Sequence, residues 1–179
     1  MDKFDCPGSI CDHMIAGSNR VLETIQGAIP ASSWYINSLN LTKGTLGNRS
    51  FINQLSYSPL DNAVAIVGTN DGNVQIGYNL GQGIVNSATW VNVTGGNTVL
   101  PNRPILDVAM SHANAWEGFA AVGGFDQNTP STPGHVFRVV CDVNCASFTW
   151  EDKTGNLPNI PVDSIISNPN LPNQVFAGT

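Results

Sequence analysis

Two markers recur at a nearly constant interval along the 179-residue chain, and this repeat restricts the fold more than any other feature. The first marker is a glycine that ends a short apolar run, found at Gly17, Gly68, Gly123 and Gly178, 51 to 55 residues apart. The second is a tryptophan, found at Trp34, Trp90 and Trp150, 56 and 60 residues apart. A repeat of roughly this length is typical of propeller blades or of a solenoid array.

Each complete unit is predicted to contain four short β-strands. In the second unit, the alternating run INQLSYS precedes the nearly continuous apolar run NAVAIVGT, a pattern that indicates a strand buried on both faces. The sequence NDGN at 70–73 is a tight hairpin signal. It leads into NVQIGYN and then into TWVNVTG, which carries the tryptophan. No window shows an apolar period of 3.6 residues, so no helix is expected.

The repeat divides the chain into four units at approximately 1–44, 45–98, 99–155 and 156–179. The first unit is expected to contribute strands two to four of a blade, and the last unit strands one and two. About three blades cannot close into a ring, because propellers typically have four to eight. The chain is therefore expected to be part of a longer propeller or to complete a ring as a homo-oligomer.

Short motifs at the strand ends resemble a known family. The predicted first strands are followed by Ser58-Pro59 and Asn168-Pro169, and the second strands end in VGT at 67–69 and AGT at 177–179. With the tryptophan strands, these units resemble the blades of secreted bacterial β-propellers with BNR (Asp-box) repeats. That superfamily includes sialidases, xyloglucanase-type glycosidases and sortilin-type receptor domains. The resemblance covers nearly the whole chain and implies an all-β propeller segment of four-stranded blades, although the Asp box S-x-D-x-G is degenerate in every unit.

Charge and composition exclude several classes of function. The net charge is −6, and the seven Lys and Arg residues form no basic cluster, so nucleic-acid binding is not expected. No apolar run approaches the ~20 residues of a membrane helix, so no membrane insertion is expected. Only 11% of residues are charged, and Asn, Gly, Ser and Thr replace them, a composition common in extracellular or periplasmic proteins. Nothing in the sequence implies a cofactor.

The four cysteines form two local pairs, Cys6 with Cys11 and Cys141 with Cys145. Local pairing predicts two small disulfide loops and an oxidising compartment. A four-thiolate zinc site is the alternative, because both spacings are compatible with structural zinc. The large separation between the two pairs favours disulfides.

Binding residues are predicted at the start of the first strand of each unit. The repeat aligns Asn53, Asp107 and Asp163 there, and Arg49 aligns with Arg103 in the preceding linkers. In a closed propeller these positions surround the mouth of the central channel. Converging carboxylates there could bind a cation or a sugar, or act as an acid/base pair. The alternative is that Asn and Asp cap the turn by accepting backbone N–H bonds.

The sequence contains no catalytic motif of the serine-nucleophile or phosphate-loop type. His13, His112 and His135 share no ligand spacing and are expected to be solvated or in loops. The preferred interpretation is a secreted binding or scaffold module for a glycan or protein ligand, without its own catalytic centre. The alternatives are a fragment of a BNR-type glycoside hydrolase and a structural surface protein.

Overall fold

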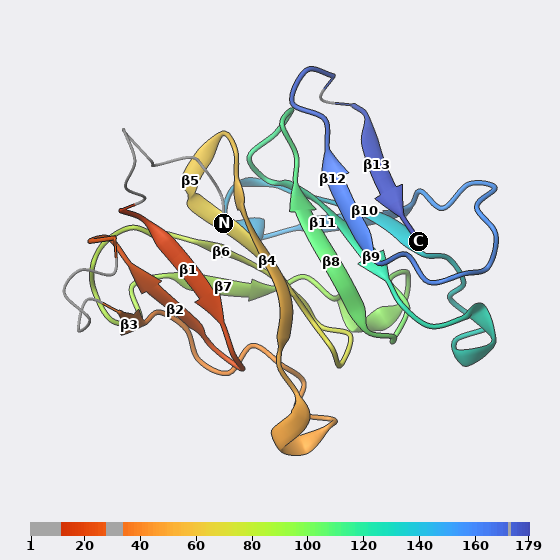
Figure 1. Cartoon of the computed structure of the whole chain (residues 1–179), viewed down its shortest axis with the longest axis horizontal. Helices are drawn as coiled ribbons and strands as arrows, with labels where there is room; N and C mark the ends of the chain where they lie inside the picture. Colours follow the sequence, from red (N-terminus) through yellow and green to blue (C-terminus); the bar gives the residue numbers. More distant parts are fainter. Residues whose placement is uncertain (1–11, 28–33, 172) are drawn as a thin grey trace.

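The structure is a computed structural model that describes residues 12–27, 34–171 and 173–179. Within these residues the chain forms antiparallel β-sheets joined by loops and short 3-10 turns, so the predicted all-β class is confirmed (Figure 1). Each strand pairs with its neighbour in sequence, so every sheet is a simple meander. None of the four sheets closes on itself.

The four sheets follow one another along the chain. The first contains β1 (Met14–Gly17), β2 (Val21–Thr24) and β3 (Tyr35–Ile36). The second contains β4 (Ile52–Ser58), β5 (Asp61–Thr69), β6 (Val74–Tyr78) and β7 (Thr89–Asn92). The third contains β8 (Ile105–Met110), β9 (Glu117–Val122), β10 (Val136–Cys141) and β11 (Phe148–Asp152). The fourth contains β12 (Ser164–Ser167) and β13 (Val175–Gly178).

Short 3-10 turns lie in the connections at η2 (Gly47–Arg49), η3 (Gly95–Asn97), η4 (Asp126–Asn128) and η5 (Val143–Cys145). The predicted hairpin at 70–73 joins β5 to β6, and Gly72 there has a φ of +79°, which suits glycine. Each sheet lies within one of the four units expected from the repeat. The first sheet has three strands and the last has two, as the strand assignment predicts.

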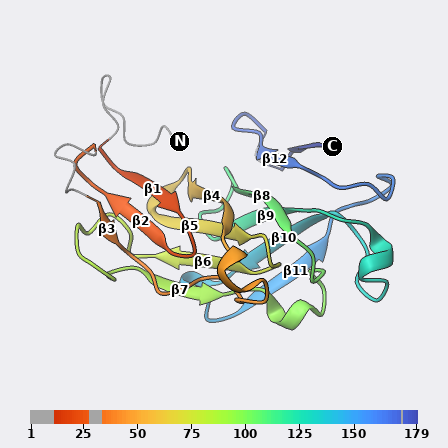
Figure 2. The same cartoon turned by 60° about the horizontal axis from the view of Figure 1, so that its bottom comes forward.

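The sheets stand side by side with their first strands adjacent (Figures 1 and 2). Strand β4 packs beside β8, and β8 packs beside β12, while β1 contacts β4. The apolar run of β5 is buried on both faces because its sheet lies between two others. Val64 and Ile66 pack into the cluster shared with the third sheet, whereas Val67 packs with Val21 of the first sheet.

The tryptophan marker has a structural cause that repeats between sheets. Trp90 Nε1 donates to the carbonyl oxygen of Asn37 at 3.0 Å, and Trp150 Nε1 donates to that of Val93 at 2.6 Å. Each acceptor lies three residues after the preceding tryptophan of the repeat. The last strand of one four-stranded sheet is thus joined by the same hydrogen bond to the sheet before it.

The glycine marker is explained for two of its positions. A Cβ on Gly17 would lie 3.0–3.2 Å from side-chain atoms of Ile52 and Leu55, and one on Gly68 would lie 2.5–3.0 Å from those of Ile105 and Val108. The close approach of the next sheet therefore leaves no room for a Cβ at Gly68, and at Gly17 a Cβ would fit only if these side chains moved by a few tenths of an ångström.

The third marker glycine, Gly123, does not occupy the position in its sheet that Gly68 occupies in the second sheet. Strand pairing sets Gly68 opposite Gln54 and Ala121 opposite Asp107. Ala121 therefore occupies the equivalent place in the third sheet. The alignment of Gly123 with Gly68 is wrong by two residues.

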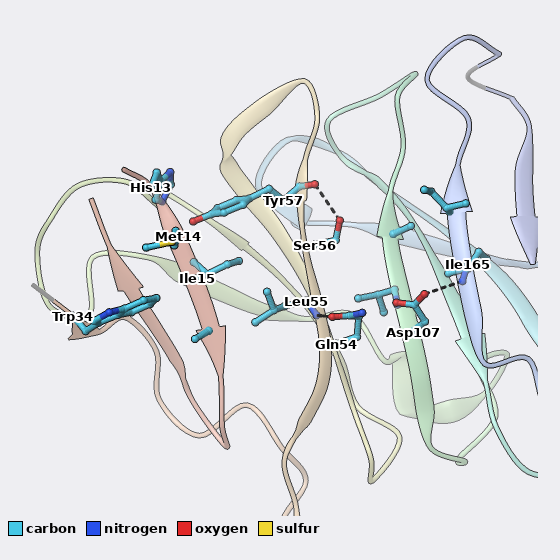
Figure 3. Close-up of a pocket in the computed structure, with 14 residues that line it drawn as sticks. His13, Met14, Ile15, Trp34, Gln54, Leu55, Ser56, Tyr57, Asp107 and Ile165 are labelled. Carbon is cyan, nitrogen blue, oxygen red and sulfur yellow. Dashed lines mark hydrogen bonds between the residues drawn. The ribbon is translucent and has the colours of Figure 1, made fainter. Parts of the chain in front are cut away.

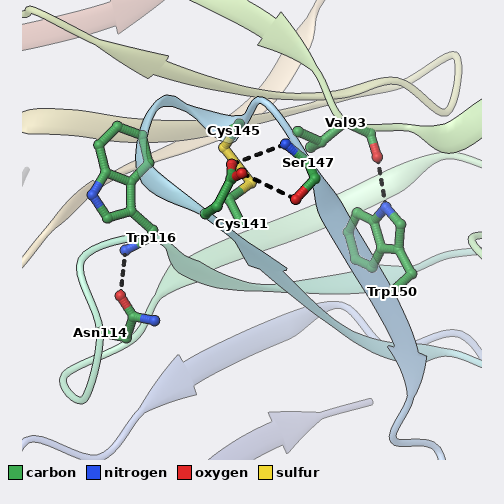
Figure 4. The surroundings of a disulfide bond; sticks show 8 residues. Val93, Asn114, Trp116, Cys141, Cys145, Ser147 and Trp150 are labelled. Carbon is green, nitrogen blue, oxygen red and sulfur yellow. Dashed lines mark hydrogen bonds between the residues drawn. A yellow bond between two sulfur atoms is a disulfide. The ribbon is translucent and has the colours of Figure 1, made fainter.

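One disulfide joins Cys141 to Cys145 across η5, which confirms this predicted pair (Figure 4). The zinc alternative is wrong for these two cysteines because their sulfur atoms are bonded to each other. Asp142 closes the loop by accepting bonds from Ser147 N at 2.9 Å and Ser147 Oγ at 3.0 Å. Cys6 and Cys11 lie outside the described residues. In the part of the chain that is described, no helix has the length and apolar character needed to cross a membrane.

Candidate functional site

A cavity of about 550 Å³ lies along the first strands of the four sheets (Figure 3). Its walls are runs of consecutive residues, at 13–16 in and before β1, 54–57 in β4, 107–109 in β8 and 165–166 in β12. Trp34, just before β3, adds an aromatic ring. The cavity therefore brings together segments that are more than 150 residues apart in sequence.

The walls of this cavity are strand edges rather than sheet faces. Successive side chains of a strand point to opposite faces, so a lining of consecutive residues presents the edge of the strand. Strands β1, β4, β8 and β12 each end the strand order of their sheet. Such edges carry backbone N–H and C=O groups that no neighbouring strand of the sheet pairs. The cavity walls thus present backbone edges, in which the N–H groups of Leu55, Val108 and Ile165 are already bound by side chains.

Asp107 is the one candidate residue from the sequence that lines this cavity. Its two carboxylate oxygens both accept backbone bonds, Oδ1 from Val108 N at 2.8 Å and Oδ2 from Ile165 N at 2.8 Å. The second of these bonds links β8 to β12 (Figure 3). This geometry is that of the capping alternative, in which the carboxylate satisfies backbone N–H groups.

Asp163 and Asn53 lie differently from Asp107. Asp163 is exposed, and its backbone N–H donates to Gly178 O at 2.8 Å. Asn53 is half-buried at a β-bulge between Ile52 and Gln54, and its Nδ2 donates to Ile105 O at 2.7 Å. It thereby links β4 to β8.

Strand pairing changes the equivalence expected from the sequence, and a bulge lies at the same point of both strands, between Ile52 and Gln54 and between Ile105 and Asp107. Pairing with β5 and β9 sets Gln54, rather than Asn53, in the place of Asp107. Gln54 Oε1 also accepts the N–H of the next residue, Leu55, at 3.2 Å, just as Asp107 accepts that of Val108.

The two aligned arginines do not line the cavity. Arg49 is exposed in η2. Arg103 is buried, and its Nη2 donates to the carbonyl oxygen of Gly134 and to Asp126 Oδ1, the latter at 3.3 Å. Burial lowers the pKa of Arg103, and the nearby Asp126 carboxylate opposes that shift. Asp126 Oδ1 also accepts Gly134 N at 2.9 Å, so this arginine anchors the loop between β9 and β10.

A buried carboxylate next to the cavity was not predicted. Glu23 of β2 is fully buried and accepts hydrogen bonds from His13 Nε2, Asn37 Nδ2 and, at 2.7 Å, Gly81 N. Burial, together with the charge and hydrogen bond of Glu23, raises the pKa of Tyr35, so this phenol stays protonated. Glu23 therefore joins the first sheet to the second.

Glu23 also fixes a histidine in the cavity wall. His13 is buried, and its ring centre lies 4.7 Å from that of Tyr57, which lines the same cavity. His13 and His135 lie in loops, as expected, but both are buried rather than solvated. No sequence signal pairs His13 with Glu23, because the contact depends on the hairpin between β1 and β2.

The described residues contain no group of three or more His, Cys, Asp or Glu side chains arranged to hold a metal ion. The cavity combines apolar side chains such as Met14 and Leu55, the aromatic Trp34 and polar strand edges. Pockets of this kind hold a ligand through apolar contact and a few directed hydrogen bonds.

No known protein family has a model that matches the chain, and no curated protein matches it significantly.

Proposed function

We propose that the chain is a secreted binding or scaffold module that holds a glycan or protein ligand in the cavity along β1, β4, β8 and β12. The observation that carries this proposal is the convergence of four strand edges and Trp34 on one space of about 550 Å³. This volume is in the range of small-molecule and peptide subsites. The disulfide at Cys141 and Cys145 supports an oxidising, extracellular or periplasmic location.

The proposal includes the architecture of a β-propeller segment. It is supported by consecutive meander sheets, by first strands that lie adjacent, and by the repeated tryptophan hydrogen bonds to Asn37 and Val93. A closed ring then needs further blades, from a longer chain or from other copies in a homo-oligomer. The cavity corresponds to a segment of the central channel of that ring.

The engagement of Asp107 supports binding rather than hydrolysis. A glycosidase needs a carboxylate able to exchange a proton with the substrate or attack it. Both oxygens of Asp107 already accept backbone N–H groups, and Asp163 does not line the cavity. Ligand contact in this proposal therefore comes from Trp34, the strand edges and the surrounding apolar side chains.

A pair of matched substitutions tests this function. Ala16 is exposed and lines the cavity, whereas Ala146 is exposed beside the disulfide loop and does not line it. Ala16→Trp should fill the cavity without altering the core, and Ala146→Trp adds the same ring elsewhere. Wild type and both variants are screened against an array of soluble glycans and an array of extended peptides.

We expect wild type and Ala146→Trp to bind the same ligand with equal affinity. Ala16→Trp should bind that ligand at least about 10-fold more weakly, which corresponds to a loss of about 1.4 kcal/mol of binding free energy. Circular dichroism and thermal unfolding establish that both variants are folded. Two results contradict the proposal: binding that folded Ala16→Trp retains in full, or no binding by wild type in either array.

A further inference from the structure

We propose that Gln54 and Asp107 determine the specificity of the cavity, and that they bind two adjacent hydroxyl groups of a neutral oligosaccharide. This inference rests on the proposed function and selects one ligand class for the same cavity. Both residues line the cavity, at equivalent places of two neighbouring first strands, β4 and β8. Figure 3 shows their side chains in the space between these two strands.

The side-chain amide of Gln54 has a defined orientation. Its Oε1 accepts the backbone N–H of Leu55 at 3.2 Å, and this bond distinguishes the oxygen of the amide from its nitrogen. Gln54 is exposed, and within the described part of the chain no hydrogen bond engages its Nε2. Both N–H groups of this nitrogen therefore remain available to a ligand.

The carboxylate of Asp107 retains part of its acceptor capacity. Each oxygen accepts one backbone N–H, Oδ1 that of Val108 and Oδ2 that of Ile165, both at 2.8 Å. A carboxylate has about four acceptor positions, so about two remain for a ligand. The same two backbone bonds hold the carboxylate in place between β8 and β12. The cavity wall thus presents amide donors beside a positioned carboxylate acceptor.

Such a pair complements two adjacent hydroxyl groups of a sugar ring. A hydroxyl both donates and accepts hydrogen bonds, so one hydroxyl donates to Asp107 while its neighbour accepts from Gln54. None of the described residues that line the cavity is Lys or Arg, and the chain has a net charge of −6. An acidic sugar would find no cationic side chain there and would lie close to the Asp107 carboxylate. The pair therefore fits a neutral glycan.

Trp34 indicates that the ligand contains more than one sugar ring. This tryptophan lines the same cavity but lies on the other side of β1, whereas Gln54 and Asp107 lie between β4 and β8 (Figure 3). The apolar face of a sugar ring packs well against a large aromatic side chain. A ligand that contacts both Trp34 and the polar pair must extend across the cavity, as an oligosaccharide does.

The strand edges around the polar pair disfavour an extended peptide as the ligand. A peptide that adds to a sheet pairs with a continuous row of free N–H and C=O groups along one strand edge. On β4, β8 and β12 this row is interrupted, because side chains already bind the N–H groups of Leu55, Val108 and Ile165. A glycan does not need such a row, since side chains bind its hydroxyl groups.

The test compares Gln54→Glu with Gln127→Glu. Gln54→Glu keeps an oxygen for the N–H of Leu55, but it removes both amide donors and adds a negative charge near Asp107. Gln127 is the matched control, because it is exposed, its Oε1 accepts Asn159 Nδ2 at 3.1 Å, and it does not line the cavity. Calorimetric titrations use the tightest neutral oligosaccharide from the glycan array and its set of monodeoxy analogues.

Gln54→Glu should bind the oligosaccharide at least about 10-fold more weakly than wild type, and Gln127→Glu should bind it as wild type does. Two analogues that lack adjacent hydroxyls should bind wild type more weakly by a similar factor. The analogue whose missing hydroxyl contacts Gln54 should show a much smaller loss with Gln54→Glu, because groups in direct contact are not additive.

Two results overturn the inference. The first is a Gln54→Glu variant, shown to be folded by circular dichroism, that binds the oligosaccharide as tightly as wild type. The second requires wild type alone: no pair of adjacent hydroxyls whose removal weakens binding.

The failure of this inference is separable from failure of the proposed function. If the arrays select an acidic glycan or an extended peptide, and Ala16→Trp removes its binding, the cavity is a binding site but not one for a neutral glycan. If Ala16→Trp changes no binding at all, the proposed function itself fails.

Discussion

The structure assigns Asp107 to holding β8 and β12 together, and this assignment predicts a specific pattern of stability loss. Asp107→Ala removes the acceptor of Ile165 N, which lies 2.8 Å away. Ile165 is only 5% exposed, so its N–H is left largely without water. A buried donor that loses its partner costs about 1–3 kcal/mol, and the bond lost here is charge-assisted.

The matched control is Asp163→Ala, because Asp163 is the aligned acid but is exposed. Surface substitutions of this kind usually change stability by less than about 0.5 kcal/mol. Urea unfolding followed by tryptophan fluorescence measures both variants, with the same slope expected for each. For a domain of this size each kcal/mol lost should lower Tm by about 2–4 °C.

Two results would refute this reasoning. The first is an Asp107→Ala variant as stable as wild type, which would mean that the bond to Ile165 contributes nothing. The second is an Asp163→Ala variant destabilised as much as Asp107→Ala, which would mean that the two acids have the same role. Asp107→Asn is informative as well, since its amide keeps one acceptor oxygen and should fall between wild type and alanine.

Three further predictions concern other contacts. Burial alone would raise the pKa of Asp71, but hydrogen bonds from nearby hydroxyl and backbone N–H groups lower it below 3.8. The ionised carboxylate therefore contributes its full stabilisation above about pH 4, and this contribution is lost as the pH falls through the lower pKa of the folded state. In urea unfolding below pH 4, the difference in stability between wild type and Asp71→Asn should therefore shrink. Trp150→Phe removes the indole donor to the buried carbonyl of Val93 and should cost about 1–3 kcal/mol, whereas an unchanged unfolding midpoint would mean that the repeated bond is without energetic effect. Replacing Cys141 and Cys145 by serine opens a short loop and should cost about 2 kcal/mol by differential scanning calorimetry, and a loss near zero would contradict the loop-entropy estimate.

Much of the fold could be predicted because the repeat carries physical information at several levels. The run from Val64 to Val67 is apolar on both faces because β5 is covered by sheets on either side. The tryptophans recur because Trp90 and Trp150 make the same bond to the preceding sheet. These signals are local in sequence and identify strands and units without knowledge of the packing.

The site was harder to predict because it depends on register and on contacts between distant strands. Strand pairing makes Gln54, rather than Asn53, the counterpart of Asp107, so the expected alignment of these two strands is wrong by one residue. Residue types alone do not fix this register, because Asn53 and Asp107 are both polar residues near the start of their strands. The cavity itself arises because four strand edges meet, and the residues that form edges are not distinguished by type from those that are paired.

The hydrogen bonds around Glu23 could not be predicted from the sequence for the same reason, that they join distant segments. Its partners His13, Asn37 and Gly81 come from three different segments, and none belongs to a recognisable motif. A lone Glu in a strand predicts an exposed side chain, because carboxylates are rarely fully buried without partners. Only the folded structure shows that the Glu23 carboxylate has several hydrogen-bond partners.

The most direct test of the central claim is an amide NMR titration of the 15N-labelled chain with a ligand found in the glycan or peptide screen. The cavity account predicts shift changes concentrated at residues 13–16, 54–57, 107–109 and 165–166, the four strand edges that wall the cavity. Shift changes confined to other surfaces, such as the disulfide loop at 141–145, with the four edges unaffected, would contradict it.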